Sequence, residues 1–305
     1  MQKPQDLFLD RNKSIERLGS ELKDFIEKFV NSNEVNKINN FINKKTDISI
    51  NSLKCDSRSF VFKQFIQSQG KFKKTFSMKG IFFESFKFLV YFIYIRIFSK
   101  KKSFEKSYEI CVDDIQSHNF GTVPERFDQL RKLTNVVFLS QRDLKEGYNT
   151  FLFKNYYSSI ISSSTCNNFL FYFQCFGRIL AESIKSGVNL FPLFRRILLI
   201  YIRYETTFNY IKAKYLIQER PYNTSQIRNE IFHKYGGKIC SVIQRNIYQI
   251  NGVGMYINAD ILFTFGSSRE IIELVNKTLG GKVKKFIPVG SLFTERELYN
   301  RKEKN

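Results

Sequence analysis

The chain has 305 residues, 43% of them hydrophobic, which excludes disorder along its whole length and is enough for the cores of two domains. Lys and Arg number 49 against 28 Asp and Glu, so the formal net charge is +21. A charge of this size is typical of proteins that bind nucleic acid or an anionic membrane. The lysines are spread along the sequence, however, and many aromatic residues fall in apolar runs. This pattern disfavours nucleic acid as the partner.

The cysteines and histidines indicate neither a disulfide framework nor a metal site. Two histidines are too few for a zinc cluster of the usual spacing, and we predict no metal. The five dispersed cysteines favour reduced thiols and a cytoplasmic setting: Cys55, Cys111, Cys166, Cys175 and Cys240. The first residues lack the basic and then apolar layout of a signal peptide, which also favours the cytoplasm.

Residues 1–75 are predicted to form a helical extension that precedes the first domain. An apolar, aromatic run follows from Gly80 to Phe98 and is closed by lysines at 100–102. Its length is near that of a bilayer span, but Glu84, Lys87 and Arg96 interrupt it. Two interpretations remain open: an interfacial helix on an anionic membrane, or a helix buried in the first domain.

The first domain is expected over residues 76–205 and has a strand–helix–strand order that is typical of a doubly wound sheet. Its first strand ends at Asp113 and Asp114, with His118 nearby. A carboxylate at a strand end facing a cleft can remove a proton from an acceptor hydroxyl, so Asp113 is a candidate base. Residues 191–204 form a second basic, aromatic stretch, predicted to be a helix that faces the membrane.

The second domain is expected over residues 206–305, where short apolar runs alternate with helical segments. This alternation predicts a parallel sheet with crossover helices, and such sheets bind ligands beyond the carboxyl ends of their strands. The predicted strands are 214–218, 238–244, 260–265 and 285–289.

Small and charged residues follow two of these strands. Gly266 and Ser267, with Arg269 and Glu270, open a helix, and the N–H groups at a helix N-terminus attract phosphate. Arg269 would neutralise the charge of a diphosphate, and Glu270 would accept hydrogen bonds from ribose hydroxyls. An ordinary N-cap with an acidic first turn explains the same residues. Gly290-Ser291 forms a tight turn that either admits a ligand or simply ends a strand.

Glu219 and Arg245 follow the other two strands. Glu219 is a candidate base, or a surface carboxylate paired with its neighbour. Arg245 is a candidate for stabilising charge on a leaving phosphate, or a member of a surface ion pair. His233 is interpreted as an exposed residue of a helix.

Residues 214–295 resemble the second domain of the two-domain, GT-B-like glycosyltransferases of bacterial surface carbohydrate biosynthesis. Three motifs carry the resemblance: SVIQRNIY at 241–248, ADILFTFG at 259–266 and FIPVGSL at 286–292. Where that family has His-Gly after the second strand, this chain has Arg245 and Asn246. A histidine contact to the phosphate or to the acceptor is therefore missing. Either Arg245 replaces this contact or the activity is lost.

The resemblance implies an α/β fold of two Rossmann-like domains with parallel sheets, and transfer of a sugar from a nucleotide-activated donor. The acceptor would be a surface polysaccharide or a lipid-linked carrier at an anionic membrane, reached from the inner face of the cell membrane. No cofactor would be required, because helix N-termini and basic side chains balance the diphosphate charge. Two alternatives stay open: an inactive scaffold of a polysaccharide assembly complex, and a nucleic-acid-binding protein.

Overall fold

A computed structural model describes the part of the chain that forms the sheet and the helices around it. The described residues are 22–67, 75–98, 106–115, 135–140, 150–152, 169–218, 224–244, 256–264, 266, 273, 276 and 280–289.

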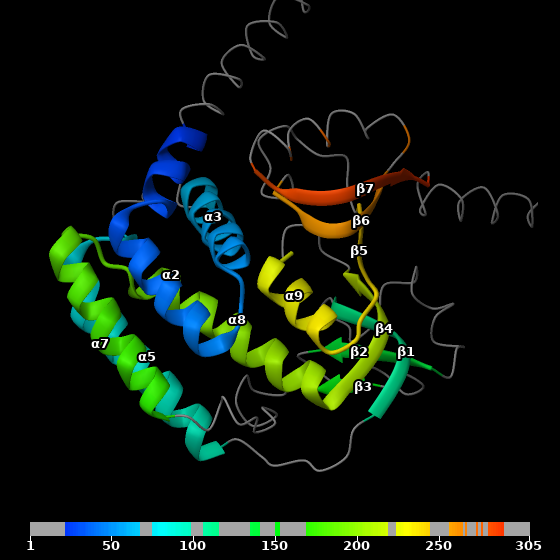
Figure 1. The fold of residues 1–305 in the computed structure, drawn as a ribbon, viewed down its shortest axis with the longest axis horizontal. Coiled ribbons are helices and arrows are strands. Elements are labelled where there is room, and N and C mark those ends of the chain that lie inside the picture. The colour runs from blue at the N-terminus through cyan, green and yellow to red at the C-terminus, as the bar shows by residue number, and fades with distance from the viewer. Residues whose placement is uncertain are drawn as a thin grey trace, which may run out of the picture.

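The centre of the fold is a seven-stranded, all-parallel sheet in the order β3-β2-β1-β4-β5-β6-β7 (Figure 1). The predicted α/β class with a parallel sheet is therefore confirmed. The strands are β1 (Lys106–Ile115), β2 (Val136–Ser140), β3 (Thr150–Leu152), β4 (Ile211–Gln218), β5 (Ile239–Ile243), β6 (Asn258–Thr264) and β7 (Lys282–Pro288).

The described strands form one sheet, whereas the sequence predicted two. β1 of the expected first domain pairs with β4 of the expected second domain from Lys106 and Ile211 to Asp113 and Gln218. The expected boundary between residues 205 and 206 lies inside a continuous helix that leads directly into β4. A division into two Rossmann-like units is not seen among the described elements.

The strand order reverses between β1 and β4, which makes this the switch point of the sheet. The chain proceeds from β1 outward to β2 and β3, and then returns to the other side of β1 to form β4. At such a point the connections leave the two strands in opposite directions and open a crevice at their carboxyl ends. The fold therefore directs attention to the ends of β1 and β4.

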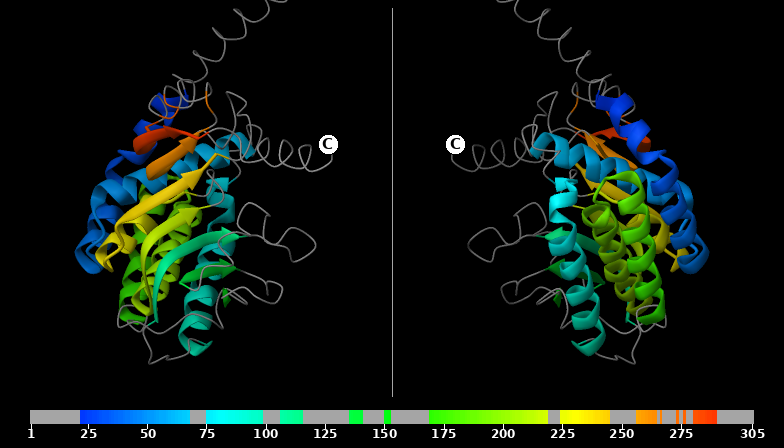
Figure 2. Two further views of the ribbon diagram at one scale, coloured as in Figure 1. Left: turned by 90° about the vertical axis from the view of Figure 1, so that its right-hand side faces the viewer. Right: turned by 90° about the vertical axis from the view of Figure 1, so that its left-hand side faces the viewer.

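Six of the described helices lie on one face of the sheet (Figure 2). They are α2 (Asn33–Thr46), α3 (Ile50–Gln67), α5 (Ile81–Phe98), α7 (Phe169–Ser186), α8 (Phe191–Tyr210) and α9 (Gln226–Lys234); a short 3-10 turn, η1 (Met78–Gly80), precedes α5. The connection from β3 to β4 and the connection from β4 to β5 cross the sheet in the same direction. Right-handed crossovers therefore place α8 and α9 on the same face.

Both faces of the central strands are buried. Alternate residues of β1 and β2, including Cys111, Val137 and Leu139, join the large core under the helices. Their neighbours Val112 and Phe138 belong to a smaller cluster on the other face. This arrangement explains why the strands read as continuous apolar runs rather than as alternating ones.

Helix α8 belongs to the core, which corrects the prediction that residues 191–204 face a membrane. Phe191, Phe194, Leu198 and Ile202 are fully buried. The helix is apolar because the other helices and the sheet pack around it, and Pro192 in its first turn fits a helix start.

Helix α5 is buried on one side, as one of its two interpretations requires, while the interfacial interpretation stays a prediction. Phe88 and Phe92 pack into the core, where Phe92 stacks on Tyr172 of α7 with ring centroids 4.5 Å apart. Its other side is exposed, and Phe82 is 85% accessible. Within the described ranges, the helices lack the combination of length and hydropathy needed to cross a bilayer.

Candidate functional site

A buried polar cluster lies at the carboxyl ends of β1 and β4. Asp113, near the end of β1, forms an ion pair with Arg228 of α9, with Oδ2 and Nη1 3.2 Å apart and both side chains fully buried. The Tyr204 hydroxyl donates to the same carboxylate at 2.7 Å. Arg228 also donates to Gln218, the last residue of β4 and the register partner of Asp113. The cluster therefore fixes the switch point against α8 and α9.

These contacts change the interpretation of Asp113. The carboxylate has no exposed surface, and Arg203 of α8 approaches its second oxygen to 3.8 Å. A carboxylate enclosed by two arginines and a tyrosine is kept from a substrate hydroxyl. The geometry favours a positioning role for Asp113 over the role of a base.

Asp56 of α3 caps the N-terminus of α9. Its carboxylate accepts hydrogen bonds from the Ser225 hydroxyl and from the backbone N–H of Gln226 at 2.7 Å and Ile227 at 3.4 Å. Ser225 in turn accepts from the N–H of Arg228. Burial raises the pKa of Asp56, although the hydrogen bonds act against that shift. The capped end orients α9, and with it Arg228, toward β1.

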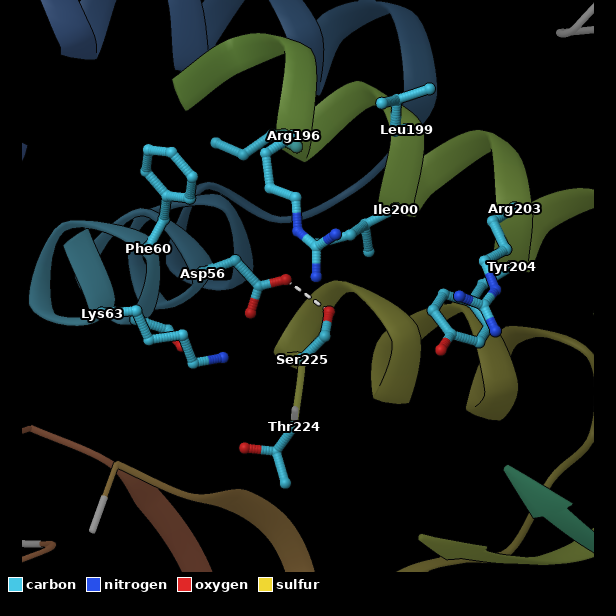
Figure 3. A pocket seen from close by; sticks show the side chains of 12 residues that line it. Asp56, Phe60, Lys63, Arg196, Leu199, Ile200, Arg203, Tyr204, Thr224 and Ser225 are labelled. Carbon is cyan, nitrogen blue, oxygen red and sulfur yellow. Dashed lines mark hydrogen bonds between the residues drawn. The ribbon is translucent and has the colours of Figure 1, made fainter. Parts of the chain in front are cut away.

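A pocket opens beside this cap, between α3, α8 and the start of α9 (Figure 3). Its volume is ≈ 60 Å³ for the centres of water-sized molecules, and ≈ 630 Å³ when all the space around it, open solvent included, is counted. The Lys63 and Arg196 side chains point toward its centre, Arg196 above Ser225 and Lys63 below Asp56, and Arg203 lies further along α8 next to Tyr204. Phe60, Leu199 and Ile200 supply apolar wall.

The pocket lies at the carboxyl edge of the sheet, close to the switch point. Thr224 and Ser225 follow β4 in the chain and precede α9, and Arg203 and Tyr204 contact Asp113 at the end of β1. Three cationic side chains line it, against one acidic side chain among the described lining residues. Such a lining suits an anion, and arginine and lysine are the side chains that bind phosphate oxygens in proteins.

In the sequence, the predicted site residues other than Asp113 follow β4, β5, β6 and β7, which are all parallel. Gly266 comes just after β6, is exposed and has a φ of 28°. The other seven lie outside the described residues: Glu219, Arg245, Ser267, Arg269, Glu270, Gly290 and Ser291. Their strands β4, β5, β6 and β7 are consecutive neighbours in the sheet.

The sequence interpretation missed the helical half of the pocket. Asp56, Ser59, Phe60 and Lys63 follow the i, i+3, i+4, i+7 spacing of one helix face. Arg196, Leu199, Ile200 and Arg203 repeat that spacing on α8. The sequence therefore shows two helix faces that carry charged side chains at helical spacing. It does not show that α3 and α8 pack against each other.

His233 is not the exposed helix residue that the sequence indicated. Its Nε2 lies 2.9 Å from the Asp260 carboxylate, and its side chain is 34% accessible. Hydrogen bonding to Asp260 raises the pKa of His233 to about 10, and Cys240 and the Gly237 carbonyl act in the same direction. Burial acts to raise the pKa of Asp260, but His233 and Lys284 outweigh it and lower that pKa.

Comparison with protein-family models, with curated proteins and with solved structures gave no match to this chain.

Proposed function

We propose that this protein is a glycosyltransferase that holds a nucleotide-activated sugar at the carboxyl edge of its sheet. The observation that carries the proposal is the basic pocket beside the β1–β4 switch point, lined by Lys63, Arg196 and Arg203. Doubly wound sheets bind nucleotides at that position. The motifs of residues 214–295 that resemble surface-carbohydrate glycosyltransferases point to a sugar as the group transferred.

In this proposal the cations of the pocket bind the diphosphate of the donor. Arg196 offers a planar fork of donors to phosphate oxygens, and Lys63 adds a point charge. Because Asp56 already accepts the first N–H groups of α9, side chains rather than the helix terminus would bind the phosphate. The Phe60 ring and the apolar wall would lie against the base or the sugar.

The chemical step is assigned to residues beyond the neighbouring strand ends. Glu219 follows β4 directly and remains the proposed base, since Asp113 is enclosed by arginines. Arg245 follows β5 and would balance charge on the leaving diphosphate. Gly266, Ser267, Arg269, Glu270, Gly290 and Ser291 would extend the nucleotide site along β6 and β7. Because arginine and lysine side chains would balance the charge of the diphosphate, the proposed transfer requires no metal or cofactor.

Nucleotide binding tests the proposal. The protein is titrated with UDP, GDP, CDP and CMP in low and high salt, and its thermal unfolding is followed. A ligand at a hundredfold excess over Kd stabilises the folded state by about 2.7 kcal/mol, which a melting curve resolves. Stabilisation by one nucleotide that persists in high salt supports the proposal. Absence of stabilisation by all four contradicts it and favours the inactive scaffold, or nucleic acid if a duplex binds instead.

The acceptor side is proposed to be an anionic membrane that carries a lipid-linked acceptor. Helices α5 and α7 pack side by side and expose large apolar side chains on their outer surfaces: Phe82, Phe83, Phe86, Val90, Ile93, Leu170, Phe173 and Ile184. Together with the net charge of +21, such a surface fits insertion into the headgroup region of an anionic bilayer. This position would bring the protein to the inner face of the cell membrane.

Vesicle sedimentation tests the membrane surface. We expect the protein to sediment with vesicles that contain phosphatidylglycerol and much less with pure phosphatidylcholine. Replacing Phe82 and Phe86 by serine should weaken that binding severalfold. Leu180 of α7 packs against the core rather than on the exposed surface. Leu180→Ala is therefore the control, and it should leave vesicle binding unchanged. Equal sedimentation of all variants would contradict the membrane assignment.

A further inference from the structure

Three metal-ligating side chains meet at the edge of the sheet opposite the pocket. They come from three elements: His233 from the end of α9, Cys240 from the start of β5 and Asp260 from the start of β6. Their ligating atoms all lie within 4.8 Å of one another. His233 Nε2 is 2.9 Å from Asp260 Oδ2 and 3.9 Å from Cys240 Sγ.

The His233 ring is held in the orientation that a ligand needs. Its Nδ1 lies 2.8 Å from the Gly237 carbonyl oxygen, so Nδ1–H donates to the backbone and Nε2 faces the other two side chains. A hydrogen bond of this kind orients most metal-bound histidines in proteins. Gly236 has a φ of 90°, and a Cβ on Gly237 would overlap the buried ring of Phe232, so the turn requires both glycines.

Asp260 is also held from outside the cluster. Lys284 of β7 lies 2.7 Å from Oδ1, and the backbone N–H of Cys240 donates to Oδ2 at 2.7 Å. These contacts fix the carboxylate beside the thiol. With Cys240 as thiolate, Asp260 as carboxylate and His233 neutral, the three ligands carry two negative charges, which a divalent ion would cancel.

We propose that His233, Cys240 and Asp260 bind a divalent transition-metal ion, with Zn²⁺ the best fit to a sulfur, nitrogen and oxygen donor set. Bonds of about 2.0–2.3 Å around a tetrahedral ion place ligand atoms roughly 3–4 Å apart. The separations of 2.9 and 3.9 Å are close to these values, and the side chains need to move only enough to bring all three atoms, now within 4.8 Å of one another, around one ion. Water would complete the fourth position, as in zinc sites with three protein ligands.

The position of the cluster indicates a structural role for the ion. It joins the C-terminus of α9 to β5 and β6, while the N-terminus of the same helix lines the basic pocket. Binding requires the Cys240 thiol and His233 Nε2 to release their protons. The Nδ1–H group of His233 keeps its proton and its hydrogen bond to the Gly237 carbonyl oxygen. The ion would therefore fix the helix that carries Arg228 without taking part in sugar transfer.

Metal titration of chelator-treated full-length protein tests the proposal. Zn²⁺ should bind with one ion per chain by calorimetry, and Co²⁺ should give a thiolate-to-metal charge-transfer band. Cys240→Ser should abolish the band, and Asp260→Asn should weaken Zn²⁺ binding at least ~10-fold. Cys175→Ser is the matched control, because Cys175 is a buried thiol on α7 outside the cluster and should leave both signals unchanged.

Several results would overturn the proposal. One is the absence of Zn²⁺ binding to the wild-type protein. Another is binding of Co²⁺ without a thiolate band, and a third is a band that Cys240→Ser leaves in place. The wild-type spectrum decides the first two even if a variant fails to fold. Each of these results would leave the cluster as an ion pair between His233 and Asp260.

Discussion

Arg228 of α9 and Asp113 of β1 form an ion pair in which neither side chain is accessible to solvent. Burial alone would lower the pKa of Arg228, but Asp113, Tyr204 and Cys240 together outweigh it and raise that pKa. The guanidinium also donates to Gln218 and to Asn229, so its charge is well satisfied. The pair connects the helix beside the pocket to the strand at the switch point.

Replacing Arg228 by Met should destabilise the protein by about 3–5 kcal/mol, since it leaves the buried Asp113 with only the more distant Arg203 to balance its charge. Asp113→Asn should cost a comparable amount. The double variant should be less destabilised than the sum of the two, because each single change leaves the other member of the pair buried without it. Denaturant unfolding of the four proteins measures these energies. Additive costs would show that the two side chains do not act as a pair.

Two glycines should respond to alanine in opposite directions. Gly237→Ala should destabilise the protein by about 1–3 kcal/mol, because the new methyl group would overlap the buried Phe232 ring. Gly177 lies exposed inside α7 with open space around it, so Gly177→Ala should stabilise by roughly 0.4–1 kcal/mol. Thermal unfolding compares the two variants. A Gly237→Ala protein as stable as wild type would show that the turn before β5 has room for a methyl group beside the Phe232 ring.

The contribution of Glu27 to stability should depend on pH. Arg58 of α3 donates to both Glu27 oxygens, at 2.6 and 2.9 Å, and the hydrogen bond from Arg58 lowers the Glu27 pKa below 4.5. A lowered carboxyl pKa adds stability that is fully present above pH 4.5 and is lost as the pH falls through the folded-state pKa. The pair is partly exposed, so Glu27→Gln should cost less than ~1 kcal/mol.

Unfolding of wild type and Glu27→Gln across acidic and neutral pH measures this contribution. The two stabilities should differ at neutral pH and converge in acid. A difference that stays constant through the acid range would mean that the charge of Glu27 is not what stabilises the pair.

The sequence predicts where the strands are, but not which strands pair with each other in the sheet. Short apolar runs identify β1, β2 and β4 to β7, because parallel strands between helices need such residues. The pairing of β1 with β4 depends on long-range packing that leaves no local pattern. Two sheets were therefore expected where the described strands form one. Helix α8 was misread for a related reason, since a helix surrounded by protein and a helix on a membrane are both apolar.

The candidate site was predictable at the strand ends and hidden on the helices. The rule that ligands bind beyond carboxyl ends led to Asp113, Glu219 and Arg245. It did not lead to Asp56, which is separated from its partner Ser225 by most of the chain. The role of Asp113 was also misjudged, because the arginines that enclose it come from distant segments.

Arg196 and its neighbours are proposed to bind the phosphate of a nucleotide, and two adjacent arginines of α8 allow a matched comparison. Arg196 lines the pocket, whereas Arg195 points to α5 and pairs with Glu84 at 3.0 Å. Replacing either by Gln removes the same charge from the same helix. By calorimetry, Arg196→Gln should weaken binding of the preferred nucleotide at least ~10-fold, about 1.4 kcal/mol, while Arg195→Gln leaves it nearly unchanged. Equal affinities for the two variants would contradict the account, since the pocket would then not be where the nucleotide binds.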